Sequence, residues 1–273
     1  FWYNIKKGGD IFMGIKILRS KISWKVVNRR RGGISLVFLH GSTMTKEGME
    51  PFAKKFKNYN CVVMDLTAHG QSKGEEPKDI AGFAADIEAT IRYLKDIKIL
   101  TGQVVLLGYS MGGAIACEIA IRKKINLSGL VILSSGGDLS SNTPLVDGLK
   151  ELPEEQFKTG DILEYLFGID TCEVVKNKIK RLFMETKVDD KIGYKDLMVS
   201  NAYNHLELCA KIKVPTYIVH GSADQIVLPN AAIETCNAIK NSQILIVPRK
   251  GHAAIYEATD YIVRNICKFI YKI

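Results

Sequence analysis

Residues 104–113 have the sequence Val-Val-Leu-Leu-Gly-Tyr-Ser-Met-Gly-Gly. The apolar run 104–107 predicts a strand buried on both faces, as the strands of parallel sheets are. The segment 111–123 that follows is helix-like in its pattern of apolar residues. Ser110 is therefore expected in a tight turn that joins a buried strand to a helix.

This Gly-x-Ser-x-Gly pattern, placed between a strand and a helix, predicts a nucleophile elbow. A serine at so tight a turn takes a strained backbone conformation, and the residues two before and two after it pass close by. Gly108 and Gly112 remove the side chains that would crowd the turn. The N-terminal amides of the helix point at the same place and favour developing negative charge there. Ser110 is the predicted nucleophile.

The strand-and-helix pattern around this turn recurs along the chain. Buried apolar runs lie at 34–39, 61–64, 104–107, 130–133, 216–219 and 244–247. Helix-like segments lie between and after them at 47–57, 79–97, 111–123, 229–240 and 253–271. This alternation predicts an α/β fold with a doubly wound, mostly parallel sheet. The alternating residues 14–28 predict a hairpin at an edge of that sheet.

The interval between the strands 130–133 and 216–219 is too long for an ordinary connection. Its periodicity is helical, so residues 138–212 are expected to form a helical cap over one end of the sheet. The core then comprises residues 14–137 and 213–273. Apolar cap residues either line a substrate pocket or form the core of the cap itself: Phe157, Leu163, Leu166, Phe167, Phe183 and Met184.

Residues 1–13 fit no predicted element and are expected to be a leader or a disordered N-terminus. The sequence Lys7-Gly8-Gly9-Asp10 can be encoded by purine-rich codons that resemble a ribosome-binding site, at a suitable distance before the codon for Met13. Our hypothesis is that translation naturally starts at Met13. Equal activity and stability of a protein beginning there would support this hypothesis.

A serine hydroxyl becomes an effective nucleophile only when a neighbouring base removes its proton. In folds with this elbow the acid and the histidine follow the serine in that order. Asp224 follows the strand 216–219, and His252 follows the strand 244–247, so both lie at carboxyl ends, where open α/β sheets bind ligands. Asp138 is the alternative acid, and the alternative interpretation of Asp224 is an ordinary turn residue.

The remaining histidines have less specific positions. His40, His69 and His220 each precede a glycine after a predicted strand, which indicates hydrogen bonds to loop backbone. His205 lies within the cap and is expected to be a surface or packing residue.

An oxyanion hole requires two backbone N–H groups that point at the carbonyl oxygen of the substrate. Met111, directly after the nucleophile, is expected to supply one of them. The loop after the strand 34–39 is expected to supply the other, at Ser42.

The formal net charge of +9 is concentrated at one end of the 273-residue chain. Residues 1–31 carry nine Lys and Arg against one acidic residue, Asp10, which leaves a net +1 for the other 242. We interpret the basic hairpin as a solvated edge that discourages strand pairing between molecules. The alternative is a surface for nucleic acid or an anionic membrane, which predicts binding that weakens steeply with salt. No nucleic-acid partner is expected.

The six cysteines include no Cys-x-x-Cys pair, and no metal site is predicted. Most lie in apolar runs, and no secretory segment is apparent, so a reducing, cytoplasmic location is expected. Neither Gly-x-Gly-x-x-Gly nor a P-loop occurs, so no cofactor is expected.

These features resemble the α/β-hydrolase superfamily over nearly all of residues 14–273. The matching pieces are His40-Gly41-Ser42, Asp65-x-x-x-His69-Gly70-x-Ser72, Gly108-Tyr109-Ser110-Met111-Gly112-Gly113, Asp224 and Gly251-His252. The resemblance is to small bacterial carboxylesterases and lipase-esterase related proteins. It implies a serine hydrolase that cleaves carboxylic esters or thioesters of small to medium acyl groups, with no integral membrane association.

Departures from relatives within the superfamily narrow this expectation. Ser110 stands where epoxide hydrolases and haloalkane dehalogenases have Asp, which argues against both of these enzyme classes. The His-Gly-Gly-Pro-Gly loop typical of proline iminopeptidases is replaced by His40-Gly41-Ser42-Thr43-Met44. Two alternatives stay open: a carbon–carbon bond hydrolase that uses the same triad, and a ligand-binding protein without hydrolytic activity.

Overall fold

The computed structural model describes residues 13–17, 20–30, 33–140 and 144–273. The expectation for the N-terminus therefore falls, except at Met13, outside the described residues. The centre of the molecule is a nine-stranded sheet with the order β1-β2-β4-β3-β6-β7-β8-β9, and β5 pairs with β2. The strands are β1 Met13–Ile17, β2 Ser20–Asn28, β3 Ile34–Leu39, β4 Asn60–Met64, β5 Lys73–Gly74, β6 Gln103–Tyr109, β7 Gly129–Leu133, β8 Thr216–Gly221 and β9 Ser242–Val247.

Six strands pair in parallel, in the sheet order β4-β3-β6-β7-β8-β9. Strand β2 pairs antiparallel with β1, β4 and β5. The predicted α/β class and mostly parallel sheet are confirmed, and so is the hairpin 14–28 at a sheet edge. The helices are α1 Lys46–Ala53, α2 Ile80–Asp96, α3 Met111–Arg122, α4 Pro144–Glu151, α5 Glu173–Glu185, α6 Asp190–Asn201, α7 Pro229–Ala238, α8 Ala254–Glu257 and α9 Thr259–Ile270.

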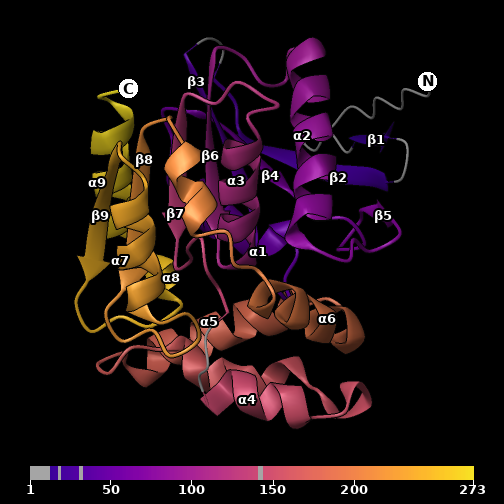
Figure 1. The fold of residues 1–273 in the computed structure, drawn as a ribbon, viewed down its shortest axis with the longest axis vertical. Helices are drawn as coiled ribbons and strands as arrows, with labels where there is room; N and C mark the ends of the chain where they lie inside the picture. The colour runs from indigo at the N-terminus through magenta and orange to yellow at the C-terminus, as the bar shows by residue number, and fades with distance from the viewer. Residues whose placement is uncertain (1–12, 18–19, 31–32, 141–143) are drawn as a thin grey trace.

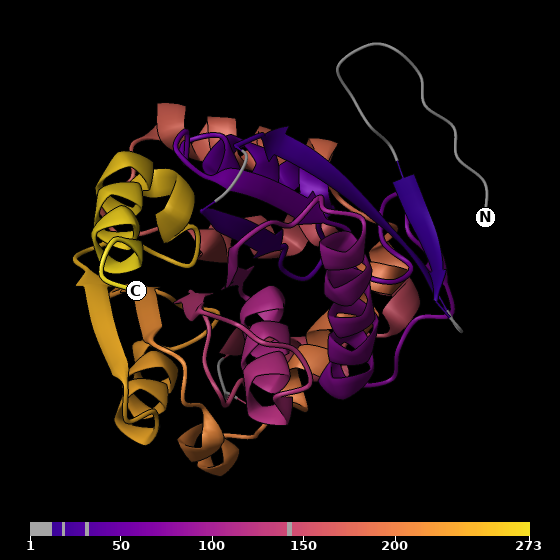
Figure 2. The ribbon, with the colours of Figure 1, turned by 90° about the horizontal axis from the view of Figure 1, so that it is seen from above.

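Helices cover both faces of the sheet (Figure 2), with α2, α3 and α7 on one face and α1 and α9 on the other. Alternate residues of one strand therefore enter different clusters. Val37 and Leu39 of β3 pack with α2 and α3, whereas Leu36 and Phe38 pack with α1 and α9. All four are fully buried. This double burial explains why the inner strands are continuous apolar runs.

Two sequence expectations need correction. The run 244–247 was expected to be buried on both faces, but β9 is an edge strand and Ile244, Leu245 and Ile246 are only half-buried. The single helix expected over 253–271 is two, α8 and α9, because the backbone at Ala258 leaves the helical conformation (φ −132°, ψ 37°).

The three helices α4, α5 and α6 lie together beyond the carboxyl ends of the parallel strands (Figure 1). We call residues 138–212 the helical insertion. It places side chains directly over the loops in which the sequence motifs fall. Among the helices that the structure describes, none is long and apolar enough to cross a membrane.

Candidate active site

Ser110 lies in the turn between β6 and α3 with φ 52° and ψ −122°, a strained backbone for a residue other than glycine. The two neighbouring glycines make this turn possible. A Cβ at Gly108 would lie 2.1 Å from the carbonyl oxygen of Gly112, and a Cβ at Gly112 would lie 2.5 Å from that of His40. A side chain at Gly108 would therefore clash within the turn, and one at Gly112 would clash with the backbone at the end of β3.

The structure brings Ser110, His252 and Asp224 into one hydrogen-bonded chain. The Oγ of Ser110 lies 2.9 Å from Nε2 of His252, and Nδ1 of His252 lies 2.8 Å from Oδ2 of Asp224. His252 and Asp224 are each 3% exposed, whereas Ser110 is half-buried. Because Asp224 accepts at Nδ1, Nε2 carries the lone pair and faces the serine hydroxyl. A neutral imidazole in this tautomer is positioned to take the proton of Ser110.

Four donors surround the carboxylate of Asp224. Oδ1 accepts from the backbone N–H groups of Ile226 and Val227, and Oδ2 accepts from His252 and, at 3.1 Å, from Nε2 of His220. Burial alone would raise the pKa of Asp224, but the attraction of His252 when that ring is protonated, and the hydrogen bonds from both histidines, lower it below its usual value. Asp224 is therefore a carboxylate at neutral pH.

Asp138, the alternative acid, has other partners. Its Oδ1 accepts from the backbone N–H and the hydroxyl of Ser140 at 2.8 and 2.5 Å. Its backbone forms an isolated bridge to Asn204. Of the two candidate acids, Asp224 is the one whose carboxylate meets His252.

The loop after β3 lies against the elbow. A Cβ at Gly41 would be 3.0 Å from Cβ of Ser110 and 3.1 Å from Cδ1 of Tyr109, so any larger residue would push the loop or these side chains apart. Ser42 is the next residue, and Met111 is the first residue of α3. Because the first N–H groups of a helix have no partner within it, the amide of Met111 is available to a ligand. Met111 thus follows Ser110 directly in the chain, and Ser42 follows Gly41, whose backbone packs against Ser110.

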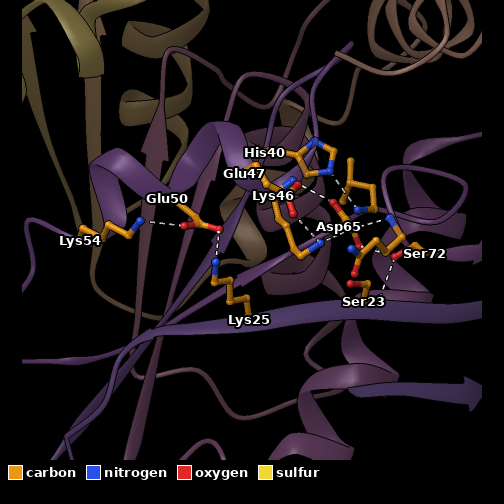
Figure 3. A network of polar contacts seen from close by, with 11 residues as sticks. Ser23, Lys25, His40, Lys46, Glu47, Glu50, Lys54, Asp65 and Ser72 are labelled. Atoms are coloured by element: carbon orange, nitrogen blue, oxygen red, sulfur yellow. Dashed lines mark hydrogen bonds and ion pairs between the residues drawn. The ribbon is translucent and has the colours of Figure 1, made fainter. Parts of the chain in front are cut away.

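A buried ion pair anchors the loop between Ser42 and α1 to the loop after β4 (Figure 3). Nζ of Lys46 lies 2.7 Å from Oδ2 of Asp65 and 2.9 Å from Glu47, and the Lys46 side chain is fully buried. Asp65 also accepts from the backbone N–H groups of Lys46 and Gln71. A Cβ at Gly70 would lie 2.6 Å from the Asp65 carboxylate, and φ there is +51°. The Asp65–Gly70 segment therefore closes around this lysine.

The expected backbone contacts of three histidines are confirmed. Nδ1 of His40 bonds the Gly41 carbonyl, and Nδ1 of His69 bonds the Thr67 carbonyl. Nε2 of His220 bonds the Val227 carbonyl at 2.9 Å, in addition to its contact with Asp224. His205, expected to be a surface or packing residue, also contacts a carboxylate of the core, because its Nδ1 lies 2.7 Å from Oε2 of Glu118 on α3.

Lys46 and Asp196 of α6 belong to no motif in the sequence that predicts a role for them. Asp196 is fully buried, and its Oδ2 lies 2.8 Å from Nε2 of His69 and 2.9 Å from the backbone N of Thr43. No motif marks it, because its partners lie 127 and 153 residues away along the chain. A lone aspartate in an amphipathic helix gives no signal of this kind.

The apolar candidates for pocket lining are largely packed inside the protein. Phe157 is fully buried in a cluster with Leu149 and Ile162, within the helical insertion. Four others join the larger core cluster that includes α1 and α9: Leu163, Leu166, Phe167 and Phe183. Met184 is 45% exposed. The four side chains in the cluster with α1 and α9 hold the insertion against the sheet, whereas Phe157 fills the interior of the insertion itself.

A surface cavity of about 350 Å³ lies away from this site, at the end of α3 opposite Ser110, and includes Lys123, Lys124 and Lys213 in its lining. The twelve-residue helix α3 separates the two places by roughly 18 Å. Within the described ranges, no group of three or more His, Cys, Asp or Glu side chains is arranged to hold a metal ion.

Comparisons with known proteins identify a family and a fold for this chain. The model of a hydrolase family described as serine aminopeptidase, S33, matches residues 34–259. Lipase 1 of Psychrobacter immobilis is 25% identical, over 93% of this chain and 83% of its own length. A proline iminopeptidase of Saccharolobus solfataricus is 28% identical, over 98% of this chain and 93% of its own.

The same fold occurs in the crystal structure of a lipase-esterase related protein from Clostridium acetobutylicum. The two structures superpose with a TM-score of 0.79 over 91% of this chain and 99% of the other, at 23% identity. The predicted resemblance to α/β-hydrolases of the esterase and lipase type is confirmed.

Proposed function

The chain belongs to the hydrolase family described as serine aminopeptidase, S33, and we propose that it hydrolyses carboxylic esters of small to medium acyl groups through Ser110, His252 and Asp224. One observation carries this proposal. It is the continuous chain of hydrogen bonds, 2.9 and 2.8 Å long, that runs from the strained Ser110 through His252 to a buried carboxylate.

In the proposed reaction Oγ of Ser110 attacks the ester carbonyl carbon while Nε2 of His252 takes the hydroxyl proton. The N–H groups of Ser42 and Met111 stabilise the oxyanion of the tetrahedral intermediate. The intermediate collapses to an acyl-enzyme, and His252 returns the proton to the departing alcohol. Water, deprotonated by His252, then releases the carboxylic acid and restores Ser110. Asp224 keeps the imidazole in the required tautomer throughout.

The choice of an ester over a peptide bond rests on the oxyanion loop and on the relatives. The loop sequence His40-Gly41-Ser42-Thr43-Met44 departs from the His-Gly-Gly-Pro-Gly of proline iminopeptidases. Lipase 1 of Psychrobacter immobilis is named for ester hydrolysis and aligns over 93% of this chain. Thioesters present the same carbonyl chemistry and belong to the proposed substrate class.

The test is a panel of p-nitrophenyl esters of increasing acyl length, with an acyl thioester and proline p-nitroanilide alongside. We expect turnover of esters, with a maximum at short or medium acyl length, and at least tenfold slower turnover of the anilide. Ser110→Ala should lower kcat by about 10³–10⁶ and should abolish labelling by a fluorophosphonate. Ser140→Ala is the matched control, because Ser140 is not part of the hydrogen-bonded chain from Ser110 to Asp224. This variant should leave kcat and fluorophosphonate labelling unchanged.

Other outcomes would assign the protein differently. Faster cleavage of the anilide than of every ester would make it a peptidase. Equal turnover by the Ser110→Ala variant would remove Ser110 from the mechanism. Binding of esters without turnover or labelling would favour a ligand-binding protein, and cleavage confined to vinylogous diketones would favour a carbon–carbon bond hydrolase.

A further inference from the structure

Helix α6 of the insertion lies directly on the oxyanion loop. Gly193, Asp196 and Ser200 share one face of the helix, because they are spaced three and four residues apart. Oγ of Ser200 lies 3.2 Å from Oγ of Ser42, and Oδ2 of Asp196 lies 2.9 Å from the backbone N of Thr43. A Cβ at Gly193 would lie 3.0 Å from Cγ2 of Thr43, so the glycine permits this close packing.

Thr43 has a conformation that the loop would not keep by itself. Its φ is +65°, in the left-handed region, where a β-branched residue is strained. Its N–H donates to Asp196, and its carbonyl oxygen accepts from the N–H of Val188 at 3.0 Å. Both backbone polar groups of Thr43 are thus held by the insertion. Strain of this kind persists only where the surroundings enforce it.

Asp196 is itself fixed by a charged partner. Its Oδ2 lies 2.8 Å from Nε2 of His69, whose Nδ1 lies 2.8 Å from the Thr67 carbonyl oxygen. Since neither partner is a donor, both nitrogens of His69 carry protons and the ring is an imidazolium. Burial would lower the pKa of His69, but the charge and hydrogen bond of Asp196 raise it to about 9.

The other titratable groups around His69 are compatible with this charge. The charge of Glu76 raises the pKa of His69, whereas the charge of Lys46 acts on the neighbouring His40, whose pKa it lowers. The His40 ring, 5.1 Å away between centroids, is neutral, because its Nε2 accepts from the N–H of Leu66. A buried ion pair between His69 of the core and Asp196 of the insertion therefore joins the two parts.

We propose that Asp196 is a positioning residue for the oxyanion loop, which it holds through the N–H of Thr43 so that the N–H of Ser42 stays beside Ser110. This inference rests on the proposed function, since the loop geometry matters to acyl transfer at Ser110. It gives the insertion a part in the chemical step as well as in covering the site. Asp196 acts through the loop and touches no reacting atom.

Three variants test this role. Asp196→Ala removes the acceptor for the Thr43 N–H together with the charge beside His69. Asp196→Asn keeps one oxygen acceptor for the Thr43 N–H, removes the charge and replaces the second oxygen with an NH2 group. Glu118→Gln is the matched control, because Glu118 forms another histidine–carboxylate contact between core and insertion, with the partly exposed His205. Among the described contacts of Glu118, none is with the oxyanion loop.

We expect Asp196→Ala to lower kcat on the best ester by about 10–100-fold with KM within twofold, because loss of one oxyanion donor costs about 10²–10³-fold. Asp196→Asn should recover most of that loss. Glu118→Gln should keep kcat within twofold even where its thermal stability falls. An unchanged kcat in Asp196→Ala, a change in KM alone, or an equal loss of kcat in Glu118→Gln would overturn the proposal.

Hydrogen exchange of peptides covering residues 40–45 gives a readout that needs no substrate. The Thr43 amide should be protected in the wild type and in Asp196→Asn, and should exchange at least tenfold faster in Asp196→Ala. If no ester is turned over but this pattern holds, the proposed function fails and the structural hold stands. Equal exchange of the Thr43 amide in the wild type and both variants would overturn the proposal that Asp196 fixes the loop. If Asp196→Ala does not fold, loss of protection of this amide in Asp196→Asn would overturn it.

Discussion

The imidazole rings of His40 and His69 lie 5.1 Å apart between centroids and carry different charges. His40 accepts a hydrogen bond from the Leu66 N–H, so it is neutral, whereas both nitrogens of His69 face acceptors. Burial and the neighbouring His69 lower the pKa of His40 well below its usual value, and Asp196 raises that of His69 to about 9. One uncharged and one charged histidine therefore lie next to each other, at the start of the loop His40–Met44.

This pair predicts a maximum of stability near pH 6.5. The raised pKa of His69 contributes stability that is fully present below its unfolded value of 6.5 and is lost as pH rises through about 9. The shift corresponds to about 3 kcal/mol. The lowered pKa of His40 acts in the opposite sense, so stability is also lost as pH falls below 6.5.

The measurement is urea unfolding of the wild type and of His69→Gln at pH values from about 5 to 9.5. The wild type should lose stability on both sides of the maximum. His69→Gln should be less stable near pH 6.5 and should lack the alkaline decline. An alkaline decline that survives in this variant would contradict the assigned charge of His69.

The second prediction concerns the acid of the triad. Asp224→Asn should lower kcat by about 10²–10⁴-fold, because an amide cannot hold His252 in the tautomer that accepts the Ser110 proton. Binding of substrate does not use this carboxylate, so KM should change little. Steady-state kinetics on the best ester of the panel provides the measurement.

Asp138→Asn is the matched control, since Asp138 bonds Ser140 rather than His252. Its kcat should stay within about twofold of the wild-type value. If Asp138→Asn lost activity and Asp224→Asn kept it, the acid would be Asp138 and the assignment made from the hydrogen bonds would be wrong.

The third prediction concerns the buried ion pair of Lys46 and Asp65. Lys46→Met should lower the free energy of unfolding by about 3–5 kcal/mol, because it leaves the buried Asp65 carboxylate without its counter-charge. Chemical denaturation at neutral pH gives the value.

The double variant Lys46→Met with Asp65→Asn tests whether the unpaired charge of Asp65 causes this loss of stability. Asparagine keeps an acceptor for the backbone N–H groups of Lys46 and Gln71 but carries no charge. The double variant should recover at least about 1 kcal/mol relative to Lys46→Met alone. Additive losses would mean that the lysine acts through packing rather than through its charge.

The helices of the core were predictable because their apolar residues follow one period over several turns, and the inner strands were predictable because they are continuous apolar runs. The run 104–107 and its neighbours were placed correctly, since burial on both faces leaves a continuous apolar run. The edge strand β9 was misjudged for the same reason. Its composition is that of an inner strand, and only the order of strands shows that one side of it lacks a partner.

The sequence alone determined the elbow at Ser110 and the chain order of its partners, because a strand, a tight turn with two glycines and a helix are local features. Only the tertiary structure shows that the carboxylate of Asp224, and not that of Asp138, bonds His252, since both residues follow strands. It alone also joined Asp196 to Thr43 and His69. Those contacts link residues more than a hundred positions apart, and the packing of α6 over the sheet, which no local pattern encodes, brings them together.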